Sequence, residues 1–206
     1  MSDLQCACTL LVARHGQAEY ETATLTDAGG SLTLTGRKQA SELAESLRGR
    51  RVAYVYTSPL ARAVQTAEIV AGALGVGVRV REGLQELTVG AFEGQSEDIG
   101  FGPFMQAFQA WAGGDLEVTY DGGESAEQVV ARMREVLETI VDLHRGETVL
   151  VIGHGGSMCL ALPRLVSNLP DNHASSLRIA NAAIVEMLAD ADDWRCVSWP
   201  DEVDEA

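Results

Sequence analysis

The sequence is almost without lysine: Lys38 is the only one among 206 residues, and arginines supply the rest of the basic charge. Thirty acidic residues outweigh them and set the formal net charge at −15. This balance excludes nucleic acid and anionic membrane surfaces as partners, because both require a basic footprint on the protein. The same acidic field repels anionic ligands, so a site for one must be built from locally concentrated positive groups.

Long apolar runs are also missing. No stretch approaches the roughly 20 apolar residues that span a bilayer, and the first residues, Met1 to Leu4, lack the basic charge of a signal peptide. Cysteine is scarce, with only Cys6, Cys8, Cys159 and Cys196. Cys6 and Cys8 stand too close together in an extended strand to pair with each other. We therefore expect a cytoplasmic protein with four reduced thiols.

The four histidines are scattered rather than grouped at the spacing of metal ligands, which argues against a zinc site. Internal repeats and low-complexity tracts are absent as well. With 206 residues and 46% apolar composition, the chain is expected to form one domain spanning residues 1–206.

What the sequence does contain is an alternation of apolar strands and amphipathic helices. Strands are expected at Thr9–Ala13, Val52–Thr57, Gly75–Arg81, Val149–Ile152, Ala183–Leu188 and Arg195–Ser198, the last two at the edge of the sheet. Helices are expected at Thr35–Arg48 capped by Thr35, from Pro59 to Leu74 capped by Ser58, from Ser125 as cap to Arg145, and from Gly155 onward. This alternation predicts an α/β fold, a three-layer sandwich with helices on both faces of a mostly parallel sheet.

Two stretches interrupt the alternation. Residues 27–31 form a glycine-containing loop, and residues 88–123 combine many glycines with aromatic side chains. We expect the second stretch to be a lid-like insertion with a short helix at Phe104–Trp111. The acidic C-terminal tail, residues 190–206, is expected to fray beyond Pro200.

The first candidate for chemistry is Arg14-His15-Gly16, at the end of the first expected strand. Ligands of parallel α/β sheets bind at the carboxyl ends of the strands. A neutral imidazole there can attack phosphorus if its other ring nitrogen donates to a fixed acceptor such as a backbone carbonyl. Arg14 would bind phosphate oxygens, and Gly16 lets the backbone approach closely. The tripeptide alone can arise by chance, and its place after a strand is what favours a site.

The second candidate is Gly153-His154-Gly155-Gly156, where another buried strand brings a histidine to the start of a helix. The N–H groups and the dipole of a helix start favour a bound anion. Either histidine alone is as well explained as a structural residue. Two histidines at the ends of two buried strands favour a shared site.

Arg62 and Glu86 are weaker candidates. Arg62 is expected in the first turn of a helix, where a cation opposes the helix dipole, so it invites a functional reason such as a bound phosphate. A solvated surface arginine explains Arg62 equally well. Glu86, between Leu84 and Leu87, fits a proton donor whose pKa is raised by partial burial. Taken alone, it is better explained as a solvated loop glutamate.

Together these segments resemble the histidine phosphatase superfamily, also called the phosphoglycerate mutase-like family, from Leu10 to about Leu188. The segments that carry the resemblance are Arg14-His15-Gly16, Leu34-Thr35-Gly36 with Gln39-Ala40, Ser58-Pro59-Leu60 with Arg62 and Gln65-Thr66-Ala67, Leu84 to Gly94, Gly122-Gly123-Glu124-Ser125, and Gly153 to Gly156. The resemblance implies a phosphoglycerate mutase-like fold and a phosphorylated His15. It also implies that Glu86 is the proton donor and that the phosphate oxygens are held by Arg14, Arg62, His154 and the Gly155 N–H.

The loop after Gly16 departs from the family pattern. Many members carry a phosphate-binding asparagine at the position of Glu21, and their glycine-containing segment with a basic residue is replaced here by Ala23–Ser31. The loop therefore lacks two common phosphate contacts. Gln17-Ala18 resembles the branch that includes small protein-phosphohistidine phosphatases, which are usually shorter and lack a lid.

The expected function is the hydrolysis of phosphate monoesters of small molecules through a phosphohistidine on His15. Glu86 would act first as acid and then as base. Arg14, Arg62 and a protonated His154 would neutralise the developing charge, so we expect no cofactor and no metal. The expected partner is a small phosphorylated metabolite, and a homodimer is left open.

Three alternatives stay open. A phosphoglycerate mutase would return the phosphate to a bound sugar acid, although such mutases usually have longer chains and more cationic substrate loops. A protein phosphohistidine or phosphoserine phosphatase would need a wider mouth than an aromatic lid leaves. A catalytically inactive relative that only binds a phosphorylated partner would not need all five site residues.

Overall fold

The computed structural model describes residues 6–19, 25–174 and 179–200 of the chain. The strands are β1 (Cys8–Arg14), β2 (Val52–Thr57), β3 (Gly77–Val80), β4 (Thr148–Gly153), β5 (Ile184–Ala189) and β6 (Trp194–Ser198). The helices are α1 (Leu34–Ser46), α2 (Ala61–Leu74), the short 3₁₀ helix η2 (Gly90–Phe92), α3 (Glu97–Ala112), α4 (Ala126–Leu143) and α5 (Gly155–Leu165).

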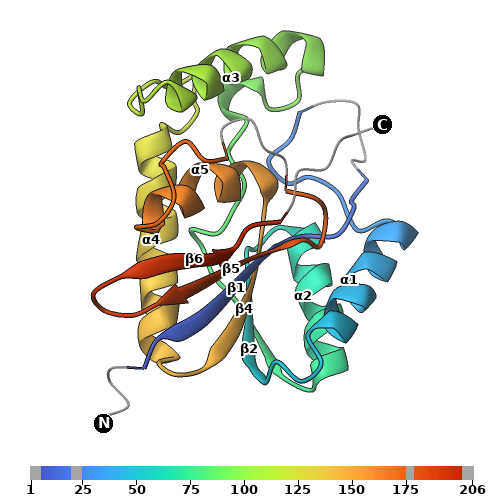
Figure 1. Cartoon of the computed structure of the whole chain (residues 1–206). Coiled ribbons are helices and arrows are strands. Elements are labelled where there is room, and N and C mark those ends of the chain that lie inside the picture. The colour runs from blue at the N-terminus through green and yellow to red at the C-terminus, as the bar shows by residue number, and fades with distance from the viewer. Residues whose placement is uncertain (1–5, 20–24, 175–178, 201–206) are drawn as a thin grey trace.

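One sheet with the strand order β3-β2-β4-β1-β5-β6 runs through the molecule (Figure 1). β4 pairs in parallel with both β1 and β2, and β2 pairs in parallel with β3. β5 runs antiparallel to β1 and to β6. The prediction of a mostly parallel sheet is confirmed. The edges are β3 and β6, so the expectation that both late strands are edge strands holds for β6 and is wrong for β5, which pairs on both sides.

Helices cover both faces of the sheet, α1 and α2 on one side and α4 and α5 on the other (Figure 1). Leu10 and Val12 of β1 pack in the cluster under α4 and α5, whereas Leu11 and Ala13 pack in the cluster under α1 and α2. Successive strand residues point to opposite faces, so a strand covered on both faces is apolar throughout. The predicted three-layer sandwich is confirmed.

The helix starts test the predicted caps. α1 begins at Leu34, and its N-cap is Thr33, whose hydroxyl oxygen accepts the Gly36 N–H at 2.9 Å. The prediction that Thr35 caps this helix is therefore wrong by two residues: Thr35 lies inside the first turn, and the side chain of Thr33 accepts the free N–H instead. The cap of α4 is Ser125, as expected, and it forms a reciprocal capping box with Gln128. None of the helices in the described ranges is long and apolar enough to cross a membrane.

Residues 88–123, the lid segment, contain η2 and α3, which lies at the top of Figure 1. α3 begins at Glu97 and is longer than the predicted helix at Phe104–Trp111. A third apolar cluster beneath it includes Trp111 and Tyr120 and joins the lid segment to α4 and α5. This packing stabilises helical turns that the local glycines and Pro103 disfavour.

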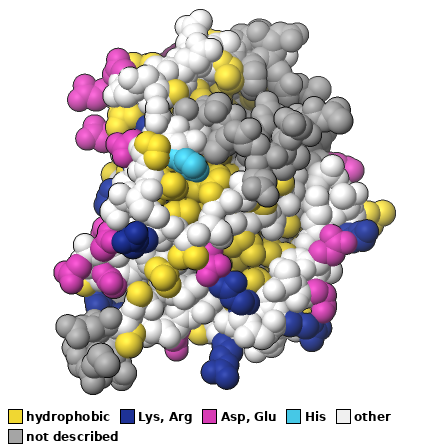
Figure 2. All heavy atoms as spheres, viewed as in Figure 1, with side chains coloured by type: hydrophobic (Ala, Val, Ile, Leu, Met, Phe, Trp, Pro, Cys, Tyr) yellow, Lys and Arg dark blue, Asp and Glu magenta, His cyan; other side chains and the backbone are white. Residues whose placement is uncertain are grey.

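An anion site in this acidic protein needs a local cluster of basic side chains. On the face shown in Figure 2, basic side chains are scattered singly among acidic and hydrophobic ones rather than gathered into one patch. All four cysteines have free thiols, two of them buried. Two arginines lie instead at the carboxyl ends of parallel strands: Arg62 is buried and Arg14 is half-buried.

Candidate active site

Adjacent parallel strands bring the two candidate histidines together. Arg14, the last residue of β1, is in register with Gly153, the last residue of β4, so His15 and His154 follow at matching positions. Their ring centroids are 5.1 Å apart. The neighbouring strand β2 leads into α2, whose second residue is Arg62. The structure thus gathers the three strand-end segments that the sequence singled out.

His15 is buried, and two hydrogen bonds define its tautomer. The Arg62 Nε–H donates to His15 Nε2 at 3.1 Å, so the ring proton resides on Nδ1, which lies 2.6 Å from the carbonyl oxygen of Gly16. The fixed backbone acceptor expected for a nucleophilic histidine is therefore present. Burial, with the charges of Arg62 and Arg14 in addition, lowers the pKa of His15 to about 3. The ring is neutral at physiological pH, and Nε2 keeps its lone pair.

His154 is completely buried. Its Nε2 lies 2.6 Å from the hydroxyl of Ser58, and its Nδ1 has no hydrogen-bond partner in the described part of the chain. Burial, and then the nearby charge of Arg62, lower the pKa of His154 well below its usual range. The expectation of a protonated His154 is therefore wrong for this structure, because water cannot stabilise a further positive charge beside Arg62.

Ser58 does not cap the following helix, which corrects a second expectation. The N-cap of α2 is Leu60, and no side chain makes the capping hydrogen bond. The hydroxyl of Ser58 contacts His154 instead. Its contact with the Leu60 N–H is much longer, at 3.4 Å. A side chain expected to stabilise a helix thus belongs to the site.

Two guanidinium groups accompany the imidazoles. Arg62 is 4% exposed and also donates to the carbonyl of Ala28. Arg14 donates through Nη1 to the carbonyl of Ile179 at 2.7 Å, while its Nε is buried without a hydrogen-bond partner among the described residues. This Nε faces the start of α5, because a Cβ built on Gly155 would stand 3.2 Å from it.

The unpartnered donors point to a ligand. Buried polar groups in folded proteins nearly always have hydrogen-bond partners. Arg14 Nε and His154 Nδ1 have no hydrogen-bond partner among the described residues. Arg14 ends β1 and His154 directly follows β4, and these two strands pair with each other. A third such atom, Arg164 Nε, lies elsewhere, near the far end of α5. An anion bound here would accept a hydrogen bond from Arg14 Nε, and one from His154 Nδ1 in the tautomer that carries the ring proton on that nitrogen.

A close backbone contact positions the loop that follows β1. A Cβ on Gly16 would stand 2.5 Å from the carbonyl oxygen of Gly36, and one on Gly36 would stand 2.0 Å from that of Gln17. The Gly16 N–H donates to Thr66 Oγ1 at 3.1 Å, and the Gln17 N–H donates to Gln39 Oε1 at 2.7 Å. The residues of α1 and α2 that carry the family resemblance therefore hold the loop in place.

Glu86 lies against the start of α5. Its carboxylate accepts the Gly156 N–H at 2.9 Å, the Ser157 N–H at 2.7 Å and the Leu87 N–H at 3.0 Å. The side chain is partly buried, so it is more than a solvated loop residue. Its partner Gly156 follows His154 by two residues, so the carboxylate lies at the same end of β4 as His154.

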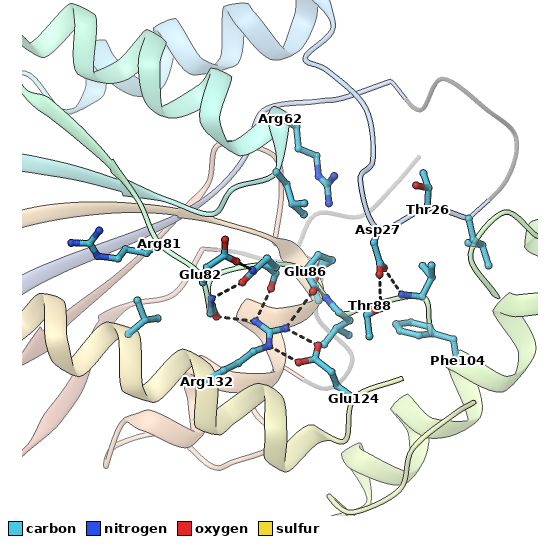
Figure 3. A pocket seen from close by; sticks show the side chains of 18 of the residues that line it. Thr26, Asp27, Arg62, Arg81, Glu82, Glu86, Thr88, Phe104, Glu124 and Arg132 are labelled. Atoms are coloured by element: carbon cyan, nitrogen blue, oxygen red, sulfur yellow. Dashed lines mark hydrogen bonds and ion pairs between the residues drawn. The ribbon is translucent and has the colours of Figure 1, made fainter. Parts of the chain in front are cut away.

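Arg132 on α4 is a residue of this region that the sequence analysis missed. Its guanidinium pairs with both carboxylate oxygens of Glu124, at 2.7 and 3.0 Å. It also donates to the backbone carbonyls of Gly83, Gln85 and Glu86 (Figure 3). Arg132 thereby fixes the backbone that carries Glu86.

A cavity of about 990 Å³ opens beside the site (Figure 3). Arg62, Glu86 and Gly156 belong to its wall, whereas His15 and His154 do not. The rest of the wall comes from residues 25–27, from the segment 81–89, from the lid segment, from α4, and from Leu60 and Glu124. Among the described residues, no group of three or more His, Cys, Asp or Glu side chains could hold a metal ion.

The structure describes residues 25–31 of the loop that departs from the family pattern. Glu21 and the first two residues of Ala23–Ser31 lie outside the described residues. Within the described remainder, Asp27 accepts hydrogen bonds from the Thr88 hydroxyl and from the Val89 N–H, both at 2.5 Å. This part of the loop is therefore tied to the lid segment through Asp27 and to Arg62 through the carbonyl of Ala28.

Comparison with known proteins places these features in a family. The model of the histidine phosphatase superfamily (branch 1) matches residues 10–202. The probable phosphoglycerate mutase GpmB of Erwinia tasmaniensis is 28% identical over 197 residues, which are 91% of this chain and 88% of the relative. Phosphoglycerate mutase-like protein 4 of Arabidopsis thaliana is 28% identical over 198 residues, 93% of this chain and 84% of the relative. The solved structure of a mycobacterial glucosyl-3-phosphoglycerate phosphatase is 27% identical, with a TM-score of 0.78 and coverage of 94% of this chain and 98% of its own.

Proposed function

Because the chain belongs to the histidine phosphatase superfamily, we propose that it hydrolyses phosphate monoesters of small molecules through a phosphohistidine on His15. One observation carries the proposal. The lone pair on Nε2 of the neutral His15 accepts the Arg62 Nε–H in this structure, and attack on phosphorus requires Arg62 to turn from Nε2 to the phosphate. Two buried nitrogens of the neighbouring strand ends, Arg14 Nε and His154 Nδ1, have no hydrogen-bond partner in the described structure. A phosphoryl group is an anion that accepts from such donors while its phosphorus meets the lone pair.

The phosphate oxygens are held by groups from three strand ends. Arg14 and Arg62 supply positive charge, and the Gly155 N–H supplies a helix-start donor. A neutral His154 contributes a hydrogen bond rather than a charge. If the Ser58 hydroxyl donates to Nε2, the ring proton of His154 resides on Nδ1, the nitrogen that lacks a partner. Two guanidiniums then offset the charge of the phosphate, and the proposed reaction requires no metal.

The reaction proceeds in two steps. In the first, His15 Nε2 forms a bond to phosphorus, the ester P–O bond breaks, and protonated Glu86 gives its proton to the leaving oxygen. In the second, water attacks phosphorus, the N–P bond breaks, and Glu86 takes the proton from water and returns to its starting state. Glu86 accepts two N–H groups on Oε1 and one on Oε2 in this structure, so Oε2 keeps a lone pair that can carry the proton.

The proposal is tested by trapping the intermediate. The protein is mixed with para-nitrophenyl phosphate and quenched in alkali, in which an N–P bond survives, and the phosphorylated peptide is identified by mass spectrometry. We expect the phosphate on His15, and we expect His15→Ala to lose at least about a thousandfold in kcat with no trapped phosphate. His173→Ala, at a histidine that packs against Trp199, is the matched control and keeps both. Turnover of His15→Ala near that of the wild type would overturn the proposal.

The remaining parts of the proposal concern conditions and partners. We propose that the enzyme is cytoplasmic, consists of a single domain with a lid at residues 88–123, and acts on a small phosphorylated metabolite. Activity that is unchanged after treatment with a chelator supports metal independence. Activity lost to the chelator and restored by a divalent cation would contradict it.

A mutase activity is the second candidate, because the relatives described above carry the names of phosphoglycerate mutases. A mutase must hold a phosphorylated acid while the phosphate moves between its hydroxyl groups. The two activities are separated by supplying 3-phosphoglycerate with a bisphosphoglycerate primer and measuring both isomer formation and free phosphate. We expect free phosphate to exceed isomer formation.

A further inference from the structure

The cavity beside the site has two ends, which lie on opposite sides of Glu86. Figure 3 shows Thr26, Asp27 and Phe104 on one side of Glu86 and Arg81 on the other. We call the first end the lid lobe. The residues that define it are Leu25, Asp27, Val89, Phe92, Phe104 and Tyr120.

The wall of the lid lobe is built before any substrate arrives. Tyr120 lies 5.5 Å from Phe104 and 6.3 Å from Phe92, measured between ring centroids. The hydroxyl of Tyr120 donates to the carbonyl of Thr88. These contacts orient three aromatic rings along one wall of the cavity, which favours an aromatic or aliphatic group of a ligand.

The opposite wall is tied to the lid segment by backbone hydrogen bonds. The Leu25 N–H donates to the Gln95 carbonyl at 2.9 Å, and the Gly94 N–H donates to the Leu25 carbonyl at 2.8 Å. Asp27 accepts from Thr88 and Val89. Leu25, whose apolar side chain belongs to the cavity lining, is therefore fixed to the lid segment.

Positive charge is missing from this lobe. None of the described residues that define it is basic, and its one charged side chain, Asp27, is negative. The basic residues of the cavity serve other contacts: Arg62 bonds His15, Arg132 pairs with Glu124, and Arg81 lies 5.5 Å from the ring of Tyr56 at the other end. Among the described residues that define the lobe, a carboxylate or second phosphate on the ligand would meet no basic partner and one like charge.

We propose that the lid lobe receives the organic group of the substrate, and that this group is aromatic or otherwise apolar and bears no negative charge. The inference rests on the proposed phosphatase function and specifies its substrate class. It distinguishes this site from one built for a phosphorylated sugar acid, whose carboxylate needs a cation beyond the phosphate position.

The test uses three aryl phosphates of nearly equal size and leaving-group strength. They are the para-hydroxymethyl, para-aminomethyl and para-carboxymethyl derivatives of phenyl phosphate, which are neutral, cationic and anionic at the far end. We expect kcat/KM for the neutral and cationic esters to exceed that for the anionic ester about tenfold. Glycerol phosphate, a small neutral ester without an apolar group, should be slower than the neutral aryl ester.

Two variants assign the preference to the lobe. Phe104→Ala removes part of the aromatic wall and should lower kcat/KM for the neutral aryl ester about tenfold while changing that for glycerol phosphate little. Thr26→Lys places a cation at the lobe and should raise kcat/KM for the anionic ester relative to the neutral one. Thr139→Lys is the matched control, because Thr139 lines the same cavity on α4 with residues of the other end.

The outcomes separate the two proposals. An anionic ester hydrolysed as fast as the neutral one, or a Thr26→Lys variant that changes nothing, overturns the substrate class and leaves the phosphatase function standing. Failure of the wild type to hydrolyse any of the four esters overturns the phosphatase function itself. Tenfold discrimination that Thr26→Lys reduces and Thr139→Lys preserves supports the inference.

Discussion

At the scale of single residues, the hydroxyl of Ser58 decides which nitrogen of His154 can donate to an anion. The two side chains meet at 2.6 Å although 96 positions separate them in the chain. The hydroxyl can donate a hydrogen bond to Nε2 or accept one from it. Only the first arrangement leaves the proton on Nδ1, the nitrogen without a partner.

Ser58→Ala tests this role. Removing the hydroxyl leaves a buried ring nitrogen without its partner, so we expect kcat/KM to fall about tenfold and the free energy of unfolding to fall by about 1–3 kcal/mol. The nitrogen chemical shifts of the His154 ring, measured by NMR, should report Nδ1–H in the wild type and a changed tautomer in the variant.

A purely structural hydroxyl gives a different pattern. Ser46→Ala removes a hydroxyl that donates to a backbone carbonyl at the end of α1, and we expect it to affect neither kcat/KM nor the ring shifts. An unchanged tautomer together with kcat/KM within about twofold of the wild type in Ser58→Ala would contradict the role that we assign to Ser58.

The positions of the principal site residues could be predicted from the sequence, but the protonation states of the histidines could not. His15, Arg62 and His154 directly follow or nearly follow buried strands, and strand ends of parallel sheets converge on one edge. The neutral state of His154 depends on complete burial beside Arg62, which no local pattern encodes. Arg132 was missed for a related reason: its partner Glu124 and the carbonyls it binds come together only through the packing of α4.

At the scale of elements, two helical glycines with opposite surroundings allow a matched prediction. In α1, a Cβ on Gly36 would collide with the Gln17 carbonyl, whereas in α2 a Cβ on Gly72 would meet nothing within 4 Å. Gly36→Ala should lower the free energy of unfolding by about 1–3 kcal/mol and reduce kcat, because the loop carrying His15 must shift. Gly72→Ala should raise it by about 0.5–1 kcal/mol with kcat unchanged. Chemical denaturation and steady-state kinetics measure both; equal effects of the two variants would contradict the close contact.

The contact between α4 and the segment that carries Glu86 gives a second prediction at this scale. Arg132→Lys keeps the charge but cannot make the paired contact with Glu124 and reach the three backbone carbonyls together. We expect kcat to fall about tenfold, because the proton donor is displaced, while the affinity for inorganic phosphate changes little. Arg134→Lys, at an exposed residue on the same helix that faces Glu138, is the control. Equal losses in the two variants would argue against a positioning role for Arg132.

Periodicity predicted most elements, and the exceptions have physical causes. β1, β2, β4 and α4 are buried on defined faces, so their apolar patterns are strong. The first turns of α3 contain Gly100, Gly102 and Pro103, which are poor helix formers, and their helical state comes from the lid segment's packing on α4 and α5. The pairing of β5 with β1 is a long-range contact that an apolar run cannot specify.

At the scale of the whole molecule, the site makes stability depend on pH. The pKa of His15 is lowered from 6.5 to about 3 in the folded protein, so between these values the unfolded chain binds a proton that the folded chain does not. Stability is therefore lost as the pH falls from about 6.5 toward 3. Burial of His154 acts in the same direction.

This loss can be isolated by removing one imidazole. We expect the free energy of unfolding of the wild type to fall, relative to that of His15→Asn, by about 1.4 kcal/mol per pH unit between pH 6 and pH 4. Urea denaturation in phosphate-free buffer measures the difference, which cancels the contribution of the many carboxylates. A constant difference between the two proteins across this range would show that His15 is not held neutral by burial.

The position of β4 between β1 and β2 has a consequence for synthesis. A ribosome delivers β1, α1, β2 and α2 before the strand that joins the two halves of the parallel sheet exists. The carbonyl of His15 also accepts a hydrogen bond from the side chain of Asn181, which is synthesised after β4. We therefore expect that phosphate does not stabilise the nascent chain. Phosphate binding and catalytic activity should appear together, after residues through Asn181 have been synthesised and have folded.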